Sequence, residues 1–141
     1  MLVRLMYASR ATDTVNHEAL SAILRKSMAN NPSVGVTGVL CSSGSIFLQV
    51  LEGGRSQVSA LYNKITRDPR HHEVVLLSYE EISERGFAGW AMGQVNMARL
   101  NPALLLKYSE AAVLDPYAVS GGVSMALFNE LVATASVMCQ T

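Results

Sequence analysis

Gln49 is the residue whose position most needs a chemical explanation. It lies in the apolar run IFLQVL at residues 46–51. Side chains alternate between the two faces of a strand, so Gln49 shares a face with Phe47 and Leu51. A buried amide without partners costs about 1 to 3 kcal/mol. The sequence therefore predicts partners for its oxygen and its N–H groups, and neighbouring backbone is the simplest source of them.

Tyr7 is a second candidate, because it ends the apolar run at residues 2–8 on the same face as Val3 and Leu5. It is either a half-buried strand aromatic, or a phenol that donates a hydrogen bond to an amide and an electron to an excited chromophore. Trp90 and Met92 are two residues apart in a predicted strand and are expected to share a face. For that pair, plain core packing is the simpler interpretation.

Polar residues also gather where the predicted helices end. Asparagine suits a helix C-terminus, which Asn30 and Asn31 are predicted to occupy, but the Asn31 carboxamide also matches a ring edge that carries N–H beside C=O. Arg70 and two histidines follow Asp68 in a turn, where such clusters are usually solvated. With three histidines and no ligand spacing in the whole chain, no metal site is expected.

These residues are positioned by strands and helices in the order βαββαββ. Strands are expected at residues 2–8, 36–43, 45–53, 71–82 and 90–97, and helices from about 16 to 28 and from 55 to 66. This order predicts an α+β, ferredoxin-like fold, with an antiparallel or mixed sheet, two helices on one face and one added strand.

The C-terminal region is predicted to add two helical pieces after Asn101-Pro102. From Pro116 to Thr141 the only charge is Glu130. A helix with so little polar surface is normally buried, so it should pack on the open face of the sheet or in a dimer interface. Residues 1–97 are thus expected to form the main domain, and residues 98–141 a helical extension of it.

Composition limits the function classes. A chain of 141 residues with 50% hydrophobic and 16% charged residues suits one globular domain. Eleven basic and eleven acidic residues without a basic patch argue against nucleic-acid binding. Two cysteines, no signal peptide and no membrane-spanning run predict a soluble, cytoplasmic protein. Because no glycine-rich phosphate loop, nucleophile elbow or thiol-histidine signature occurs, an enzyme is not expected.

Five spaced motifs resemble the BLUF family, the flavin-binding blue-light sensors. They are YAS at the end of the first strand, NNPSVGVTGVL after the first helix, FLQVLEG, DPRHH and WAMG, and together they span residues 1 to about 97. The short chain is similar to the family's short bacterial members. The resemblance implies a non-covalently bound flavin, FAD with FMN as the alternative, between the two helices.

The resemblance also implies roles for individual residues. The photoactive pair is matched by Tyr7 and Gln49, and Trp90 and Met92 match the switching strand beside the glutamine. The positions that match flavin contacts are Ile23, Ser27, Asn30, Asn31, Gln49, Asp68, Arg70 and His71. In the implied mechanism an electron and a proton leave Tyr7 after excitation by blue light, and their return leaves Gln49 rotated or tautomerised.

The implied output is a signal to a separate, unidentified partner protein, and the chain is expected to form a homodimer. One alternative is a ferredoxin-like regulatory domain that binds a small molecule without photochemistry. A second is an acylphosphatase-like enzyme, which would need a phosphate-cradling loop after the first strand. The sequence YASRATDT supplies Arg10 there but no glycines.

Overall fold

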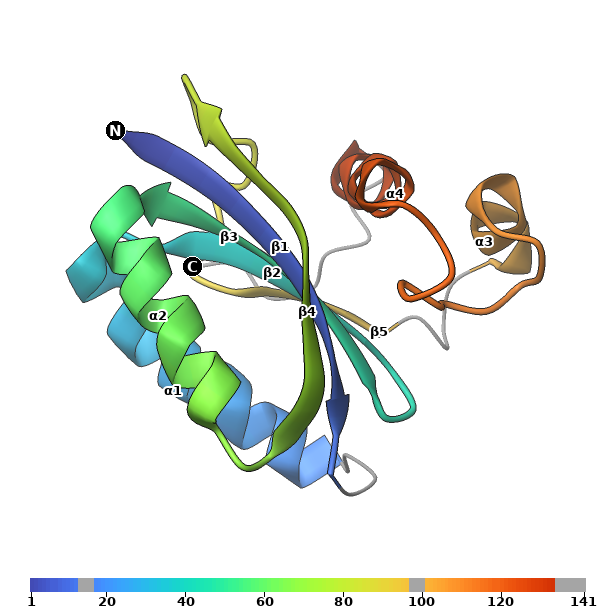
Figure 1. Ribbon diagram of the computed structural model, residues 1–141, viewed down its shortest axis with the longest axis horizontal. Helices are drawn as coiled ribbons and strands as arrows, with labels where there is room; N and C mark the ends of the chain where they lie inside the picture. The colour runs from blue at the N-terminus through green and yellow to red at the C-terminus, as the bar shows by residue number, and fades with distance from the viewer. Residues whose placement is uncertain (13–16, 97–100, 134–141) are drawn as a thin grey trace.

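A five-stranded sheet forms the middle of the molecule in the computed structural model, which describes residues 1–12, 17–96 and 101–133. Figure 1 shows α1 and α2 on one side of the sheet, with α3 and α4 on the other. The elements along the chain are β1 (Leu2–Ala11), α1 (His17–Val34), β2 (Thr37–Ser43), β3 (Ile46–Gly54), α2 (Arg55–Arg67), β4 (His71–Ile82), β5 (Gly93–Asn96), α3 (Pro102–Tyr108) and α4 (Gly121–Ala133).

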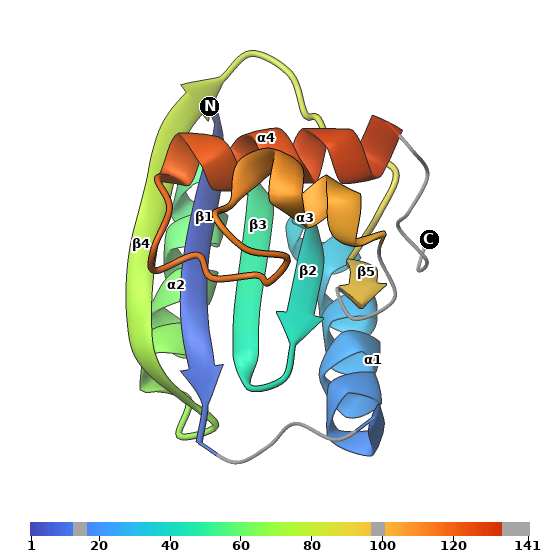
Figure 2. The same ribbon diagram turned by 90° about the vertical axis from the view of Figure 1, so that its right-hand side faces the viewer.

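The strands are arranged in the order β4-β1-β3-β2-β5. All neighbours pair antiparallel except β2 and β5, which are parallel. The first four strands have the ferredoxin-like arrangement, and β5 extends the sheet beside β2. In Figure 2, α4 crosses the strands on the face opposite α1 and α2. The predicted α+β fold is therefore confirmed, with a mixed sheet and its two faces covered as expected.

Strand alternation divides the buried side chains into two cores. The α2-side core contains Val3, Leu5, Tyr7, Ala11, Val36, Leu40, Phe47, Leu51, Val58 and Met92. The α4-side core contains Met6, Ala8, Val39, Cys41, Leu48, Val50, Phe87, Val95, Leu105, Leu114, Leu127, Phe128 and Leu131. Gln49 lies between Phe47 and Leu51 on the α2 side, as its pattern predicts.

The first helix extends further than the sequence suggested. The asparagines and proline of NNPS were expected to stop it, but α1 continues through Pro32 to Val34. Gly35 ends the helix instead, because its φ of 70° is a left-handed conformation that glycine adopts without strain. The Gly35 N–H donates to Pro32 O at 3.3 Å and the Val36 N–H to Asn31 O at 2.9 Å, which is a Schellman motif. Asn31 is therefore in the last turn of the helix and is not its cap.

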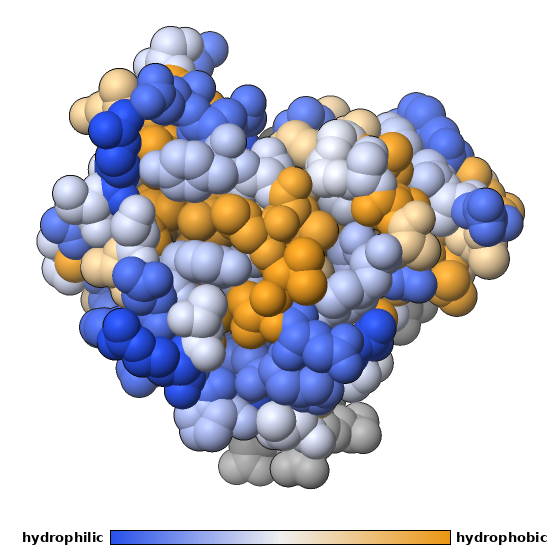
Figure 3. Space-filling view, in the orientation of Figure 1, coloured by the Kyte–Doolittle hydropathy of each residue, from blue (hydrophilic) through white to orange (hydrophobic). Residues whose placement is uncertain are grey.

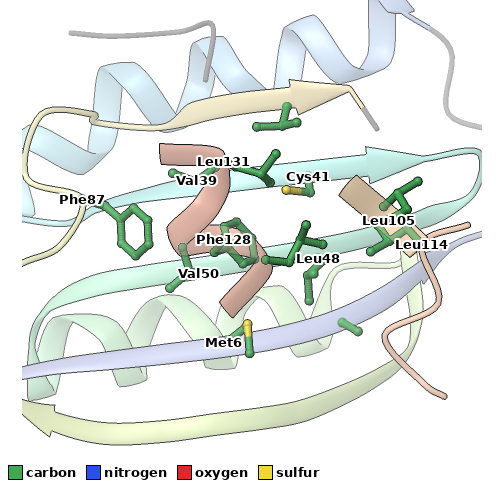
Figure 4. Packing of buried hydrophobic residues seen from close by; sticks show 13 residues of the cluster. Met6, Val39, Cys41, Leu48, Val50, Phe87, Leu105, Leu114, Phe128 and Leu131 are labelled. Atoms are coloured by element: carbon green, nitrogen blue, oxygen red, sulfur yellow. The ribbon is translucent and has the colours of Figure 1, made fainter. Parts of the chain in front are cut away.

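The C-terminal region covers the open face of the sheet, as predicted. Asn101 caps α3 by accepting a hydrogen bond from the Ala103 N–H at 3.0 Å. In Figure 4, Phe128 and Leu131 of α4 lie over β2, which carries Val39, and over β3, which carries Leu48 and Val50. The predicted apolar positions Ala135 and Met138 lie outside the described residues.

Two local predictions were wrong by a few residues. The hairpin turn is at Gly44 and Ser45 and not at Ser43 and Gly44, because Gly44 takes the positive φ that a two-residue turn needs. The last strand begins only at Gly93. Trp90 and Met92 therefore precede β5, in a bent segment to which the alternation of strand side chains does not apply.

Phe128→Ala should lower the free energy of unfolding by about 3 to 5 kcal/mol, because it leaves a cavity where a fully buried ring packs edge-on against Phe87. Thermal and urea unfolding measure the loss. The control is Val113→Ala, which removes a side chain that is 58% exposed and should change stability by less than about 0.5 kcal/mol. Equal stability of the two variants would contradict the role of α4 as cover.

Candidate functional site

A cavity of about 490 Å³ lies between the sheet, α1 and α2. This volume is within the range of small-molecule sites, about 300 to 1,000 Å³. The structure brings nine of the sequence-predicted site residues to its wall: Tyr7, Ser27, Asn30, Asn31, Gln49, Asp68, Arg70, His71 and Met92. Residues distant in the sequence therefore converge on one site.

Gln49 and Tyr7 meet directly at the sheet wall of the cavity. They are register partners in the antiparallel pair of β1 and β3, and the Tyr7 hydroxyl donates to Gln49 Oε1. Gln49 Nε2 donates to Met92 Sδ at 3.2 Å. Burial, followed by the charges of Tyr62 and Asp68, raises the pKa of Tyr7 above its usual value, so the phenol keeps its proton at neutral pH. The glutamine thus has both an acceptor and a donor contact.

Asn31 is fixed from the helix side of the cavity. It is buried, and its Nδ2 donates to the Ala91 carbonyl at 2.8 Å. This bond leaves the side-chain oxygen of Asn31 available to accept. Asn30 is exposed and Ser27 half-buried at the same cavity. The Schellman motif at Gly35 holds the backbone of Asn31, so its carboxamide is positioned by the end of α1.

The turn between α2 and β4 forms a charged part of the cavity wall. Asp68 and Arg70 form an ion pair at 2.6 Å. Hydrogen bonds from the Arg70 side chain are the main cause that lowers the pKa of Asp68 to about 2, so the pair is ionised at neutral pH. Burial lowers the pKa of His71, which makes its ring neutral there. The His71 Nδ1 lies 2.9 Å from the Ser9 hydroxyl, and the ring packs against Phe47.

Trp90 is the predicted site residue that the structure places elsewhere. Its side chain packs against the α4-side core, whereas Met92 belongs to the α2-side core. The expectation that the two share a face was wrong, because the chain bends before β5 begins. The buried indole N–H of Trp90 has no acceptor among the residues that the structure describes. The side chain of Ile23, a predicted flavin contact on α1, lies outside the described part of the chain.

Sequence reasoning missed the contribution of α2 to the cavity. One face of this helix supplies Gln57, Ala60, Leu61, Lys64 and Ile65. Their spacing follows the helical repeat and was therefore readable from the sequence, but none of them was among the predicted flavin contacts. Lys26 of α1 also lines the cavity. Two lysines, Lys26 and Lys64, therefore line the cavity.

The residues present fit a flat heteroaromatic ring with an amide-like edge. Apolar walls come from Leu40, Phe47 and Leu61, and carboxamides from Asn31 and Gln49. A carboxamide offers a donor beside an acceptor, which complements the N–H and C=O groups at the edge of a flavin. The donor set is therefore suited to flavin binding.

Among the residues that the structure describes, no group of three or more His, Cys, Asp or Glu side chains could hold a metal ion. None of the helices described is both long and apolar enough to cross a membrane.

The chain is similar to known proteins in its family pattern, its sequence and its structure. The family model "Sensors of blue-light using FAD" (BLUF) matches residues 2–93. Photoactivated adenylate cyclase subunit beta of Euglena longa is 38% identical over 92 residues, covering 64% of this chain and 11% of that protein. The blue light- and temperature-regulated antirepressor BluF of Escherichia coli K12 is 34% identical over 87 residues, covering 62% of this chain and 22% of that protein. The chain thus spans about a tenth of the length of the first curated relatives that it matches.

Solved structures match over nearly the whole chain. BlsA in its photo-activated state has a TM-score of 0.85 at 30% identity, covering 100% of this chain and 99% of BlsA. The dark-state structure of BlrB, a BLUF protein, has a TM-score of 0.80 at 31% identity, covering 95% of this chain and 96% of BlrB. Because the family model matches well over half of its residues, the chain belongs to the BLUF family of flavin-binding blue-light sensors.

Proposed function

We propose that this photoreceptor binds FAD non-covalently in the cavity and signals by rearranging the hydrogen bonds of Tyr7 and Gln49. The observation that carries the proposal is the contact between the Tyr7 hydroxyl and Gln49 Oε1 at the cavity wall. An amide with both contacts satisfied on an apolar strand face can exchange its oxygen and nitrogen by rotation alone. No bond between heavy atoms has to form or break.

The protein's part in the switch is to hold and move one proton and to turn one amide. A flavin excited by blue light supplies a strong one-electron oxidant. Tyr7 is the electron donor, and its phenolic proton has Gln49 Oε1 as first acceptor. When electron and proton return, the carboxamide of Gln49 can remain rotated or tautomerised. After rotation, Met92 Sδ would face the side-chain oxygen of Gln49. It would lose the hydrogen bond that it accepts from Gln49 Nε2 in this structure.

The ring would be held by residues of α1 and of the turn between α2 and β4. We assign its amide edge to Asn31 with Asn30, and its flanks to Ser27, Ile23 and the turn that carries Asp68, Arg70 and His71. Lys26 and Lys64 at the same cavity support a flavin that bears phosphate, since exposed ammonium groups neutralise anions. Two lysines suit the diphosphate of FAD better than the single phosphate of FMN.

The signal would leave through a separate partner protein, and the chain itself would carry out no enzymatic reaction. Residues 98–141 would belong to the same domain as residues 1–97, because Leu105 and Leu127 lie in the α4-side core with the strands. A homodimer is supported by edge strand β4, where Val75 and Leu76 are 41% and 49% exposed. Figure 3 shows an apolar area in the middle of the face that β4 crosses in Figure 1.

Tyr7→Phe and Gln49→Leu should each abolish the light-induced shift while flavin stays bound. The purified wild-type protein should be yellow, its flavin band should move slightly to the red under blue light, and the shift should reverse in darkness. Absorption spectroscopy before and after illumination measures the shift of the wild-type protein and of both variants. The physical reason is that neither replacement side chain can take part in the Tyr7–Gln49 hydrogen bond.

Tyr79→Phe is the matched control, because this tyrosine is 43% exposed on β4. It should shift like the wild type. Normal switching by Tyr7→Phe or Gln49→Leu would show that the assigned role is wrong. Bleaching of the wild-type band instead of a shift would indicate flavin reduction and contradict the hydrogen-bond switch.

The bound flavin should be FAD, and the two lysines should contribute to its affinity. Mass spectrometry of flavin released by denaturation identifies it. The double variant Lys26→Met, Lys64→Met should bind FAD several-fold more weakly than the wild type, since exposed ion pairs contribute up to about 1 kcal/mol each. The salt dependence of its FAD affinity should be reduced. Its affinity for riboflavin, which has no phosphate, should be unchanged. Equal loss for FAD and riboflavin would mean that the lysines do not recognise phosphate.

A further inference from the structure

Glu52 of β3 is a fully buried carboxylate at the end of the sheet, three residues beyond Gln49. Its Oε2 accepts from Arg4 Nε at 2.7 Å and from the Gly86 N–H at 3.0 Å, and its Oε1 accepts from the Phe87 N–H at 2.7 Å. Arg4 also pairs with it through Nη2 at 2.6 Å. A buried charge is tolerated only with such complete bonding. Glu52 therefore ties the connection between β4 and β5 to the sheet.

Arg85 holds the same connection from another side. Its guanidinium donates to the Gly35 carbonyl at 2.7 Å and to the Thr37 hydroxyl at 3.0 Å. Gly35 is the residue that ends α1, and a cation is favoured at a helix C-terminus. Residues 85–87 are thus joined to β2, β3 and the end of α1 by charge-assisted hydrogen bonds.

The other end of this segment contacts the flavin cavity. The Trp90 carbonyl accepts from the Gly38 N–H at 3.1 Å, and the Ala91 carbonyl accepts from Asn31 Nδ2 at 2.8 Å. Met92 Sδ accepts from Gln49 at 3.2 Å. Ala91 and Met92 therefore set the positions of two carboxamides that line the cavity, while Trp90 joins the segment to the backbone of β2.

We propose that Glu52 and Arg85 are positioning residues of the flavin site, which anchor residues 85–92 so that Ala91 and Met92 orient the carboxamides of Asn31 and Gln49. The proposal rests on the proposed function of that site. Neither anchor lines the cavity. Their effect reaches the cavity through the segment, which is short and carries hydrogen bonds at both ends.

The same segment reaches the opposite face of the sheet between its two ends. Phe87 is buried in the α4-side core, with its ring centroid 6.2 Å from that of Phe128. Figure 4 shows Phe87 at one end of this core, beside Val50 and Phe128. Anchoring by Glu52 therefore fixes the position of Phe87 against α4 as well as that of Met92 beside Gln49.

Glu52→Gln tests the proposal in the full-length, flavin-loaded protein in the dark. It keeps the shape of the side chain but removes the charge and places an N–H₂ group among donors. Exchange of the Gly86 and Phe87 amides should become about tenfold faster, because charge-assisted hydrogen bonds are lost. The indole N–H signal of Trp90 should move, and it is unambiguous because the chain has one tryptophan. The dark-recovery rate should change several-fold.

Glu80→Gln is the matched control, since Glu80 pairs with the same Arg4 at 3.0 Å but is half exposed. It should leave all three readouts unchanged. If Glu52→Gln accelerates exchange only at Gly86 and Phe87, and leaves the Trp90 signal and the dark recovery as in the control, Glu52 merely closes a loop and the proposal is overturned.

If Glu52→Gln fails to fold, Arg85→Gln is measured by the same three readouts. This variant loosens the segment while Glu52 keeps its partner Arg4. Wild-type protein gives a test without any variant: fast exchange of the Gly86 and Phe87 amides would refute the anchor. A wild-type protein without a light-induced shift would contradict the proposed function alone, since the amide and indole measurements in the dark do not depend on switching.

Discussion

A carboxamide on an apolar strand face must find hydrogen-bond partners, and the whole site is arranged around this requirement of Gln49. The antiparallel register of β1 and β3 places Tyr7 directly opposite Gln49. The Tyr7 hydroxyl can therefore donate a hydrogen bond to the side-chain oxygen of Gln49. A slip of one residue would send either side chain to the other face. The two cores make such a slip costly, because every strand residue beside Gln49 is buried. The strand register that buries the two cores is therefore also the register that brings Tyr7 and Gln49 together.

The face with α4 matters to the cavity although it lies on the opposite side of the sheet. The helices α1 and α2 leave space between them, so the sheet must be held rigid from its other face. Phe128 and Leu131 do this by packing on residues that alternate with Tyr7 and Gln49 along the strands. The scarcity of charge on α4 is thus explained by its packing against the sheet.

The sequence was sufficient for the topology, because periods of two and 3.6 residues report burial directly, and for nine of the residues that line the cavity. It failed where the backbone leaves regular geometry. Pro32 pointed to a helix end, yet a proline in the last turn is tolerated when Gly35 closes a Schellman motif. Trp90 and Met92 were assigned to one face by strand alternation, which does not hold in a bent segment held by tertiary hydrogen bonds. Glu52 was visible as an acid in an apolar run, but its partners are distant in the sequence.

The segment at residues 85–92 offers a physical route between the two faces of the sheet. If Gln49 rotates as proposed, Met92 loses its N–H donor, and the cavity end of the segment loses one of its contacts. The other end cannot follow freely, because Glu52 and Arg85 hold it with buried or partly buried charges. A segment fixed at one end and released at the other bends instead of translating. The residues between the two ends, including Trp90 in the α4-side core, would then adopt one of two arrangements, which is what a signalling element requires.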